Sequence, residues 1–350
     1  MAQHDTLEHW ETVRAAQYLG PGRLEVVDSP LVEARDGEAL IHVEACGICG
    51  SDLSILAGMH PRAKPPLTIG HEFCGHVMQI HGDAQGIRVG DRVAVFPLLA
   101  CGRCHACRTG NRHVCRTLRV YGIDLDGGMS QVARVATANL LPIPEEFPLA
   151  VAASLEPLAV GVHAVSRAPL NPESTVLVLG GGPVGLVTAL MLRHRGIRKL
   201  FVSEIAPFRL ELARRLGLQT LPTDKVLDSI REATGDEGAD VLFECTGAPD
   251  AARAMTDLVR SRGWIVNVGV FKSPPALDMR AVNFKELTVV GSRVYTRDDF
   301  RQAIEIAPAL LLADVVSHRF PLRDIHSALA AIAAQDRVSK VLIEPEGRLA

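Results

Sequence analysis

The stretch that decides the fold is VLVLGGGPVG, residues 176–185. An apolar run with strand character enters a Gly-x-Gly-x-x-Gly turn, and an apolar helical segment follows. The first glycine permits the tight turn, the second lets a pyrophosphate approach the backbone, and the third lets the helix pack on the strand. The helix N-terminus would then face the phosphates. The residues expected at a dinucleotide are Gly180, Gly182, Pro183, Val184 and Gly185.

An acidic residue stands where such a site needs one. The next apolar strand ends at Glu204, whose carboxylate can accept hydrogen bonds from the adenosine ribose hydroxyls. A 2′-phosphate would meet like charge there, and Ile205 and Ala206 follow in place of an arginine, so NAD is favoured over NADP. The alternative is a glycine-rich turn with an unrelated surface glutamate. The strand, the helix and the acid follow one another at the spacing that a dinucleotide site requires, which argues against this alternative.

The pattern of apolar and turn-forming residues differs between the two parts of the chain, which predicts two domains in an α/β fold. From about residue 172, apolar strands alternate with helical stretches, which is typical of a doubly wound parallel sheet. Residues 14–144 show short alternating runs broken by Gly, Pro and Asp, which indicates an irregular β-rich domain. Beyond residue 297 we expect helices over 298–311 and 322–335 and a last strand over 339–343. The expected strands of the sheet are Thr175–Leu179, Lys199–Ser203, Gln219–Leu221, Asp240–Glu244, Trp264–Val268 and Leu287–Val290.

Composition excludes several classes of protein. Of the 350 residues, 47% are hydrophobic and 22% are charged, as in an ordinary globular protein. The net charge is -3 and no long Lys/Arg block is present, so nucleic acid is not an expected partner. No apolar run approaches the ~20 residues of a membrane span. The polar N-terminus lacks the apolar region of a signal peptide, so a cytoplasmic location is expected.

Four cysteines lie within one short segment. Cys101, Cys104, Cys107 and Cys115 could bind a tetrahedral Zn²⁺ that has no open position for water, so its role would be structural. An iron-sulfur cluster and a pair of disulfides are the alternatives. We disfavour them because no second cluster motif accompanies the segment and a reducing cytosol favours metal thiolates.

A second set of residues offers mixed sulfur, nitrogen and oxygen ligands. Cys49 and His71, with a carboxylate from Glu72 or Glu156, would suit a catalytic zinc with one open position. Asp52 could orient the His71 ring. The alternative for these residues is a buried thiol and a surface pair. A redox dithiol of Cys46 with Cys49 is disfavoured, and the cysteines that match no ligand position, Cys46, Cys74 and Cys245, are expected to be buried.

The order of these motifs resembles the zinc-dependent medium-chain dehydrogenases of the alcohol dehydrogenase superfamily. The matching segments are GICGSD at 47–52, GHE at 70–72, the four cysteines, EPL at 156–158 and the glycine-rich turn. Glu156, where other branches have cysteine, is similar to the sorbitol, threonine and sugar-acid branch. VGVFK at 268–272, KE at 285–286 and GSR at 291–293 look like L-galactonate-type oxidoreductases.

The resemblance implies a GroES-like catalytic domain over residues 1–155, completed by 298–350, and a Rossmann domain over 156–297. The structural zinc lobe would span about 98–118. It implies that Arg209 contacts the adenosine ribose and that the stretch from Val268 to Val270 lines the nicotinamide pocket. It also implies a homo-oligomer, a dimer or tetramer joined through the Rossmann sheet.

The resemblance further implies that Ser51 relays a proton from the substrate hydroxyl. Many relatives have a histidine three residues later, where this chain has Ser54, so Glu156, through water, is the replacement base to test. Arg293 could bind a substrate carboxylate, the cofactor, a neighbouring subunit or a surface acid.

The function expected from all of this is NAD-dependent oxidation of a secondary alcohol with two zinc ions per chain, one catalytic and one structural. The substrate would be a small polar alcohol, such as a polyol or a sugar acid of the sorbitol or L-galactonate kind. A threonine- or 2,3-butanediol-type dehydrogenase is the alternative enzyme. A non-catalytic NAD- or zinc-binding protein is the alternative of another class.

Overall fold

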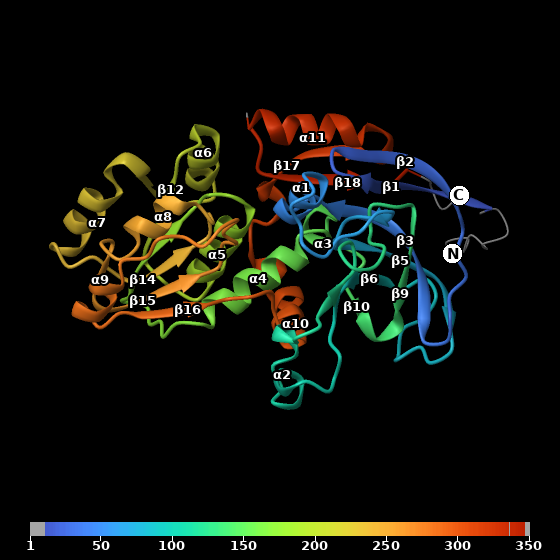
Figure 1. The fold of residues 1–350 in the computed structure, drawn as a ribbon, viewed down its shortest axis with the longest axis horizontal. Coiled ribbons are helices and arrows are strands. Elements are labelled where there is room, and N and C mark those ends of the chain that lie inside the picture. Colours follow the sequence, from blue (N-terminus) through green and yellow to red (C-terminus); the bar gives the residue numbers. More distant parts are fainter. Residues whose placement is uncertain (1–10, 336, 347–350) are drawn as a thin grey trace. The chain divides into compact units, whose positions relative to one another are not determined.

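The computed structural model describes residues 11–335 and 337–346, which fold into two compact units (Figure 1). The first unit contains residues 11–156, 316–334 and 340–346, and the second contains 157–315, 335 and 337–339. Residues 298–315, expected with the first domain, lie in the second unit. No helix among the described residues has the length and apolarity that crossing a bilayer requires.

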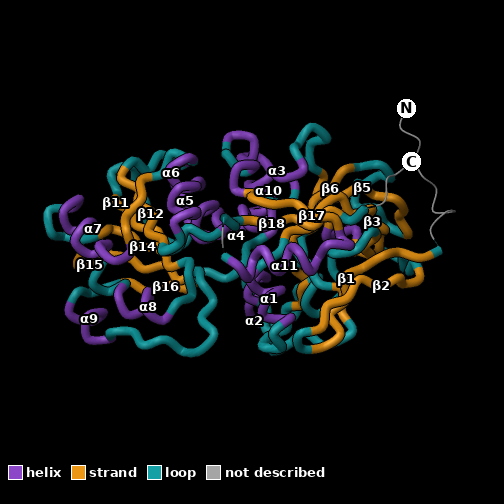
Figure 2. The backbone as a smooth tube through the Cα atoms, turned by 90° about the horizontal axis from the view of Figure 1, so that it is seen from above, coloured by secondary structure: helices purple, strands orange, loops and turns teal. Residues whose placement is uncertain are grey.

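The second unit is built on a six-stranded parallel sheet in the order β13-β12-β11-β14-β15-β16. Figure 2 shows α5 and α6 on one side of this sheet and α8 and α9 on the other. The strands are β11 (Thr175–Leu179), β12 (Lys199–Glu204), β13 (Gln219–Pro222), β14 (Ala239–Glu244), β15 (Val259–Asn267) and β16 (Thr288–Gly291). The helices are α4 (Leu155–Val165), α5 (Pro183–His194), α6 (Pro207–Arg215), α7 (Val226–Thr234), α8 (Pro249–Ala254), α9 (Met279–Phe284) and α10 (Arg297–Ile306).

The sheet confirms the predicted α/β class, and its central strand explains where a ligand would bind. β11 is buried along its whole length, as an apolar run with helices on both faces should be. Its neighbours are β12 and β14, so the strand order reverses at β11. In open α/β sheets, ligands bind outside the carboxyl ends of the strands at this reversal. Those ends are Leu179, Glu204 and Glu244.

The first unit is rich in β-structure, as its alternating pattern predicted. A seven-stranded sheet runs in the order β10-β6-β5-β3-β18-β17, with β9 also paired to β3. A three-stranded sheet, β2-β1-β4, accompanies it. The strands are β1 (Thr12–Gly20), β2 (Arg23–Pro30), β3 (Glu38–Gly47), β4 (Leu67–Thr68), β5 (Glu72–His81), β6 (Arg92–Val95), β9 (Val132–Ala136), β10 (Leu140–Pro142), β17 (Val316–Pro321) and β18 (Lys340–Glu344). The helices are α1 (Gly50–Leu56), α2 (His105–Arg108), α3 (Leu149–Ala152) and α11 (Ile325–Ala334).

Three strands of this sheet meet at the edge where the candidate metal ligands lie. Gly47, at the end of β3, pairs with Glu72 of β5 and with Leu342 of β18. In Figure 1 the blue β3 and the red β18 accordingly lie side by side. The register brings the start of α1, the start of β5 and the start of β18 to one edge.

The four-cysteine segment projects from a short two-stranded sheet formed by β7 (Leu98–Leu99) and β8 (Arg119–Val120). α2 and one 3-10 turn are the helical elements between the two strands. The lobe therefore has little apolar core of its own, and its fold must depend on the cysteines.

Candidate metal centres and cofactor site

The four cysteines of the lobe come together as predicted. Their sulfur atoms all lie within 4.8 Å of one another. The Cys104 sulfur is 3.5 Å from that of Cys107 and 3.9 Å from that of Cys115. A disulfide would bring two sulfurs to about 2 Å, whereas Zn–S bonds of about 2.3 Å in a tetrahedron separate the sulfurs by roughly 3.8 Å. The geometry fits a closed tetrahedral metal site.

The chemistry of these thiols also suits a cation. Hydrogen bonds from the backbone at Arg103 and Cys104, with one from Cys115, lower the pKa of Cys101 to about 6. Burial, by contrast, raises the pKa of Cys107 to about 12, so this thiolate requires a positive partner. A bound Zn²⁺ would supply that partner.

The second ligand set also assembles in the first unit. Cys49, His71 and Glu72 each offer a ligand atom, and these atoms lie within 4.8 Å of one another. Cys49 precedes α1, where its backbone N–H donates to Asp52 Oδ2 at 2.8 Å. Asp52 Oδ1 lies 3.9 Å from His71 Nδ1, which is near the predicted orienting contact but beyond hydrogen-bond distance.

Gly70 fixes the turn that presents His71. Its φ is +96°, and a Cβ here would lie 2.5 Å from the Cys46 sulfur and 2.8 Å from Met129 Cγ. Only glycine fits this position, both for its backbone angle and for its space. Cys46 and Cys74 are buried as predicted, while Cys245 is half-buried.

Anionic groups surround His71. Burial alone would lower its pKa, but a hydrogen bond with Cys49 and the charges of Cys49, Asp52 and Glu156 raise it well above the usual value. Glu156 is 8% exposed at the start of α4, and its charge acts on both His71 and Lys340, although the three close ligand atoms are those of Cys49, His71 and Glu72. A thiol, an imidazole and two carboxylates in a buried site are a donor set that fits Zn²⁺.

Sequence reasoning missed one member of this cluster, Lys340. It is 2% exposed, forms an ion pair with Glu72, and donates from Nζ to the Ile48 carbonyl at 2.9 Å. Burial lowers its pKa, but the charges of Glu72, Cys49 and Glu156 outweigh that effect and raise it. The signal was present, because a lysine followed directly by an apolar run, here residues 341–343, must either reach solvent or meet a buried acid.

The two serines of α1 differ in their surroundings. The Ser51 hydroxyl is buried and has no hydrogen-bond partner among the described residues. Ser54 Oγ instead donates to the Gly50 carbonyl of its own helix at 3.2 Å. An unsatisfied buried hydroxyl is uncommon and suggests a partner supplied by a ligand.

The glycine-rich turn of the second unit has the geometry that its motif requires. Gly180 has a φ of +101°. A Cβ at Gly185 would collide with the Gly180 carbonyl oxygen, so this glycine permits close packing of helix on turn. At Gly182 the nearest atom to such a Cβ is Arg209 Nη1 at 3.8 Å, which leaves the backbone approachable. Pro183 and Val184 begin α5 directly after it.

Glu204 is more engaged than the sequence indicated. Its Oε2 accepts from the Gly181 N–H at 2.9 Å, and its Oε1 accepts from Ile205 and Ala206 at 2.7 and 3.0 Å. Arg209 Nη1 lies 3.8 Å away, while its Nε donates to the Val338 carbonyl. A carboxylate has about four acceptor positions, so one remains for a ribose hydroxyl.

A second buried carboxylate, Glu244, organises the neighbouring loops. It is fully buried at the end of β14 and accepts from the backbone of Thr246 and Gly247 at 2.8 and 3.0 Å. A Cβ at Gly269 would lie 2.5 Å from its Oε2, so the turn after β15 also packs on it. Sequence reasoning missed this residue because the glycine-rich motif points to the acid of the next strand, Glu204, and gives no role to the acid that ends β14.

The remaining predicted residues lie at the carboxyl ends of β15 and β16. Val268 is half-buried, while Val270 is 88% exposed. Arg293 is exposed and forms no ion pair with the described residues. These side chains are therefore available to a ligand or another molecule.

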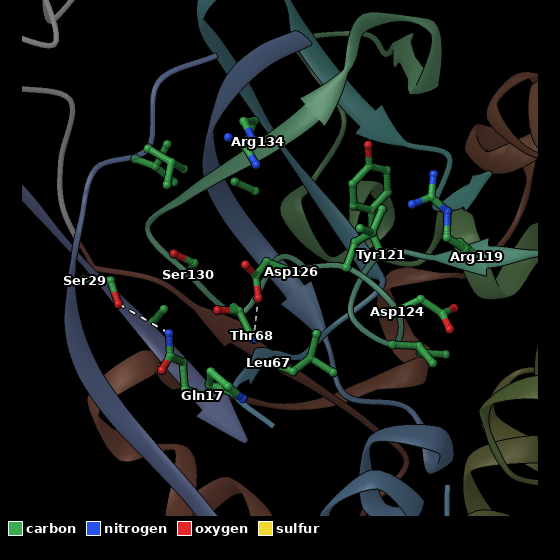
Figure 3. Close-up of a pocket in the computed structure, with 18 of the residues that line it drawn as sticks. Gln17, Ser29, Leu67, Thr68, Arg119, Tyr121, Asp124, Asp126, Ser130 and Arg134 are labelled. Carbon is green, nitrogen blue, oxygen red and sulfur yellow. Dashed lines mark hydrogen bonds between the residues drawn. The ribbon is translucent and has the colours of Figure 1, made fainter. Parts of the chain in front are cut away.

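A cavity of about 680 Å³ in the first unit lies apart from these groups. Figure 3 shows Arg119 and Tyr121 on one side of it and Gln17 and Ser29 on the other. Its polar groups largely satisfy one another. Gln17 donates to Ser29, and Asp126 accepts from the Thr68 backbone at 2.9 Å. None of the candidate metal ligands lines it.

Comparison with protein-family models covers both units. The model of the alcohol dehydrogenase GroES-like domain matches residues 35–145. The model of the zinc-binding dehydrogenase domain matches residues 183–308.

Individual relatives match nearly the whole chain. A 2-dehydro-3-deoxy-L-galactonate 5-dehydrogenase of Pseudoalteromonas atlantica is 37% identical over 94% of this chain and 98% of its own length. An L-threonine 3-dehydrogenase of Streptomyces avermitilis is 33% identical over 93% of this chain and 96% of its own. Among solved structures, a crystal structure described as a short chain alcohol dehydrogenase (rspB) from Escherichia coli CFT073, complexed with NADH, superposes with a TM-score of 0.88. The two sequences are 27% identical, and the match covers 95% of this chain and 99% of that one.

Proposed function

Because this chain belongs to the zinc-dependent medium-chain dehydrogenases and is an alcohol dehydrogenase of that family, we propose that it oxidises a secondary alcohol of a sugar acid or polyol with NAD. The observation that carries the proposal is the buried cluster of Cys49, His71 and Glu72, with the charge of Glu156 reaching His71. Such a cluster has no evident purpose in a protein that only binds.

When bound, zinc would polarise the substrate hydroxyl and the nicotinamide would accept a hydride. The chain would hold the metal with Cys49, His71 and a carboxylate of Glu72 or Glu156. Ser51 Oγ is buried and has no hydrogen-bond partner among the described residues, and we assign it the relay of the proton from the substrate hydroxyl. We assign Glu156 the role of the base. The other four cysteines would hold the structural zinc.

The cofactor assignment depends on Glu204 and the turn beside it. We assign the pyrophosphate to the start of α5 and the adenosine ribose to Glu204 and Arg209. A 2′-phosphate would approach a carboxylate that is 8% exposed, so NAD is favoured over NADP. Val268 and Val270 are assigned to the nicotinamide, whose apolar face would cover the exposed Val270 side chain.

We favour a sugar acid as substrate because the relative from P. atlantica is named for one and because Arg293 has a guanidinium free of ion pairs among the described residues. A guanidinium binds a carboxylate in a bidentate manner. The threonine-type alternative is supported by the relative from S. avermitilis. A threonine carboxylate would also suit Arg293, so rates must decide between the two.

We propose that the enzyme is cytoplasmic and assembles as a homo-oligomer, a dimer or tetramer. The support is the resemblance of the sequence together with an exposed apolar side chain, Val289, on an edge strand of the sheet in the second unit. Edge strands readily pair with a second copy.

The test is a screen for NADH formation at 340 nm on L-galactonate, sorbitol, threonine and 2,3-butanediol, with zinc content measured on the same samples. We expect the highest kcat/KM on a sugar acid or polyol, and we expect Cys49→Ser to abolish it while one zinc per chain remains. A preference for threonine would establish the alternative enzyme. If no alcohol responds and the unmodified chain carries only one zinc, the protein is a non-catalytic binder.

A further inference from the structure

The cavity in the first unit has a volume, about 680 Å³, that is typical of small-molecule sites. All of its lining residues belong to the first unit, and they come mainly from β1, β4, β9 and the chain around β8. Apolar side chains form part of the wall, and among the charged side chains the basic ones outnumber the acidic ones. The basic residues are Arg35, Arg62, Lys64, Arg119 and Arg134, and the acidic residues are Glu38, Asp124 and Asp126.

The three acids of the wall are already held by the protein. Asp124 Oδ2 pairs with Arg62 at 3.1 Å, and Glu38 Oε2 pairs with Arg134 at 3.3 Å. Asp126 Oδ1 instead accepts a backbone N–H at 2.9 Å. Two of the five cations are therefore paired, while the third acid is held by the backbone.

The other three cations have no acidic partner. Arg35, Lys64 and Arg119 form no ion pair within the part of the chain that the structure describes. The segment that supplies Arg119 adds charge of the same sign, because it contains six arginines and no acid between Asp91 and Asp124. Gathered charges of one sign raise the local concentration of ions of the other sign. The cavity therefore favours an anion.

A buried hydroxyl of the wall also lacks an acceptor. Tyr121 is 5% exposed, and its Oη accepts from the Ala136 N–H at 3.0 Å. The proton of this hydroxyl has no acceptor among the described residues. Burial raises the pKa of Tyr121, and the charge of Glu38 adds to this effect against the opposing charges of Arg119 and Arg134. The hydroxyl therefore keeps its proton, and a ligand oxygen could accept it.

Two guanidinium groups come from strands on either side of this hydroxyl. Arg119 lies two residues before Tyr121, and both line the cavity while Val120 between them does not, as alternating side chains require. Arg134 lies on β9 two residues before Ala136, whose N–H meets the Tyr121 oxygen. Figure 3 shows Arg134 on one side of the Tyr121 ring and Arg119 on the other.

We propose that this cavity is a binding site for a small organic phosphate, whose phosphate group contacts Arg119, Arg134 and the hydroxyl of Tyr121. A phosphate ester has three terminal oxygens and a charge of about −2, so it can accept from two guanidinium groups and one O–H donor at once. A carboxylate has fewer oxygens and a smaller charge. Ala15 and Val132 of the wall would contact the organic part. The inference is independent of the proposed reaction, because none of the candidate metal ligands lines the cavity.

The competing roles are ordinary solvation of surface arginines and closure of the local fold by Tyr121. Three variants separate these roles from ligand binding. Arg119→Gln removes an unpaired charge at an exposed position, so the fold should be kept. Tyr121→Phe removes the O–H donor and keeps the ring. Arg112→Gln is the matched control, because Arg112 is an exposed arginine of the same segment that does not line the cavity.

The experiment is calorimetric titration of ribose 5-phosphate, and separately of inorganic phosphate, into the zinc-loaded protein. Ribose is the uncharged match, and gluconate tests a carboxylate. Each titration is repeated with saturating NADH, which occupies the glycine-rich turn of the second unit as a competing phosphate site. We expect ribose 5-phosphate to bind under both conditions and ribose not to bind. We expect the Kd for ribose 5-phosphate to rise about 10-fold or more in Arg119→Gln, to rise several-fold in Tyr121→Phe and to stay unchanged in Arg112→Gln.

The proposal fails if the unmodified protein binds neither ribose 5-phosphate nor inorganic phosphate. Equal Kd values for the unmodified protein and Arg119→Gln would place the phosphate elsewhere, and an equal loss in Arg112→Gln would attribute binding to the general charge of the segment. Tighter binding of gluconate than of ribose 5-phosphate would overturn the assignment of a phosphate. None of these titrations requires turnover, so the failure of the dehydrogenase screen and the failure of this inference are distinguishable.

Discussion

At the scale of single residues, the candidate metal centre depends on a buried ion pair between two residues that lie far apart in the sequence, Glu72 and Lys340. Lys340 and Glu72 are both almost fully buried, and both side chains lie against the position that a Cβ of residue 47 would occupy. A Cβ at Gly47 would lie 2.8 Å from Lys340 Cε and would collide with Glu72, so glycine is required for the pair to form. The pair holds the Glu72 carboxylate and thereby limits its freedom to approach a metal.

Lys340→Met should leave Glu72 as an unpaired buried charge. Breaking one side of a buried pair costs about 3–5 kcal/mol, so we expect a large fall in the urea midpoint of unfolding. The double variant Lys340→Met with Glu72→Gln should recover much of the loss because both charges are gone. Lys199→Met is the matched control, since Lys199 also opens a strand but is exposed. Equal midpoints for the Lys340 and Lys199 variants would show that the ion pair contributes nothing.

At the scale of elements, α10 illustrates how the second unit fixes a helix start. Thr296 and Asp299 form a capping box, in which Thr296 N donates to Asp299 Oδ2 at 2.8 Å and Asp299 N donates to Thr296 Oγ1 at 3.1 Å. His163 of α4 also contacts Asp299 Oδ2 at 2.9 Å. His163 therefore links α4 to α10.

This contact predicts a dependence of stability on pH. Burial raises the pKa of Asp299, but hydrogen bonds from His163 and Thr296 outweigh it and lower the pKa below the usual value. A carboxyl with a depressed folded pKa stabilises the protein above its unfolded pKa of about 3.9, and that contribution is lost as the pH falls further.

Asp299→Asn should therefore reduce the free energy of unfolding by roughly 1–2 kcal/mol at pH 7, and the deficit should shrink as the pH approaches 3.5. Urea unfolding across this range measures it. Asp298→Asn, an exposed neighbour in the same turn, should show little change. A deficit for Asp299→Asn that is the same at every pH would contradict the role of its charge.

Local pattern was sufficient for most elements of the second unit. β11 begins and ends where the sequence predicted, because its apolar run is bounded by a turn and a glycine. β15 begins at Val259, five residues before the predicted start. The prediction began too late because Arg262 and Gly263 interrupt the apolar run of this strand. β17 was missed because its six residues include histidine, arginine and proline, and its partial burial gives no clean alternation.

At the scale of the whole molecule, the limits of sequence reasoning are those of long-range pairing. The first unit uses three separate lengths of chain, and β18 completes its main sheet beside β3. Spacing within motifs predicted both ligand sets, because each member carries its chemistry in its residue type. The sequence marks Lys340 as a lysine that needs solvent or a buried acid, but which acid it meets is decided by the long-range pairing of β3 with β5 and β18. The family resemblance implied that the whole C-terminal segment returns to the first unit, but residues 298–315 belong to the second unit, where α10 contacts α4 through Asp299 and His163.

The edge of the parallel sheet leads to a prediction about assembly. Among the described residues, β16 is the last strand of that sheet, and Val289 on it is 38% exposed. Phe284 and Met279 of α9 are 74% and 64% exposed on the preceding element. Isolated apolar side chains are ordinary on a surface, but apolar residues beside an open strand edge favour pairing with an identical edge about a two-fold axis.

Light scattering should therefore give the unmodified chain a mass that is a multiple of 37.7 kDa. Val289→Lys combined with Phe284→Ser should shift it toward 37.7 kDa, because a charge at the edge opposes pairing. Val89→Lys, which changes a 47% exposed valine of the first unit, should leave the mass unchanged. A monomeric unmodified chain would reject the assembly itself. An oligomer that survives the double change would instead move the interface away from β16, and the exposure of Val289 would then need another explanation.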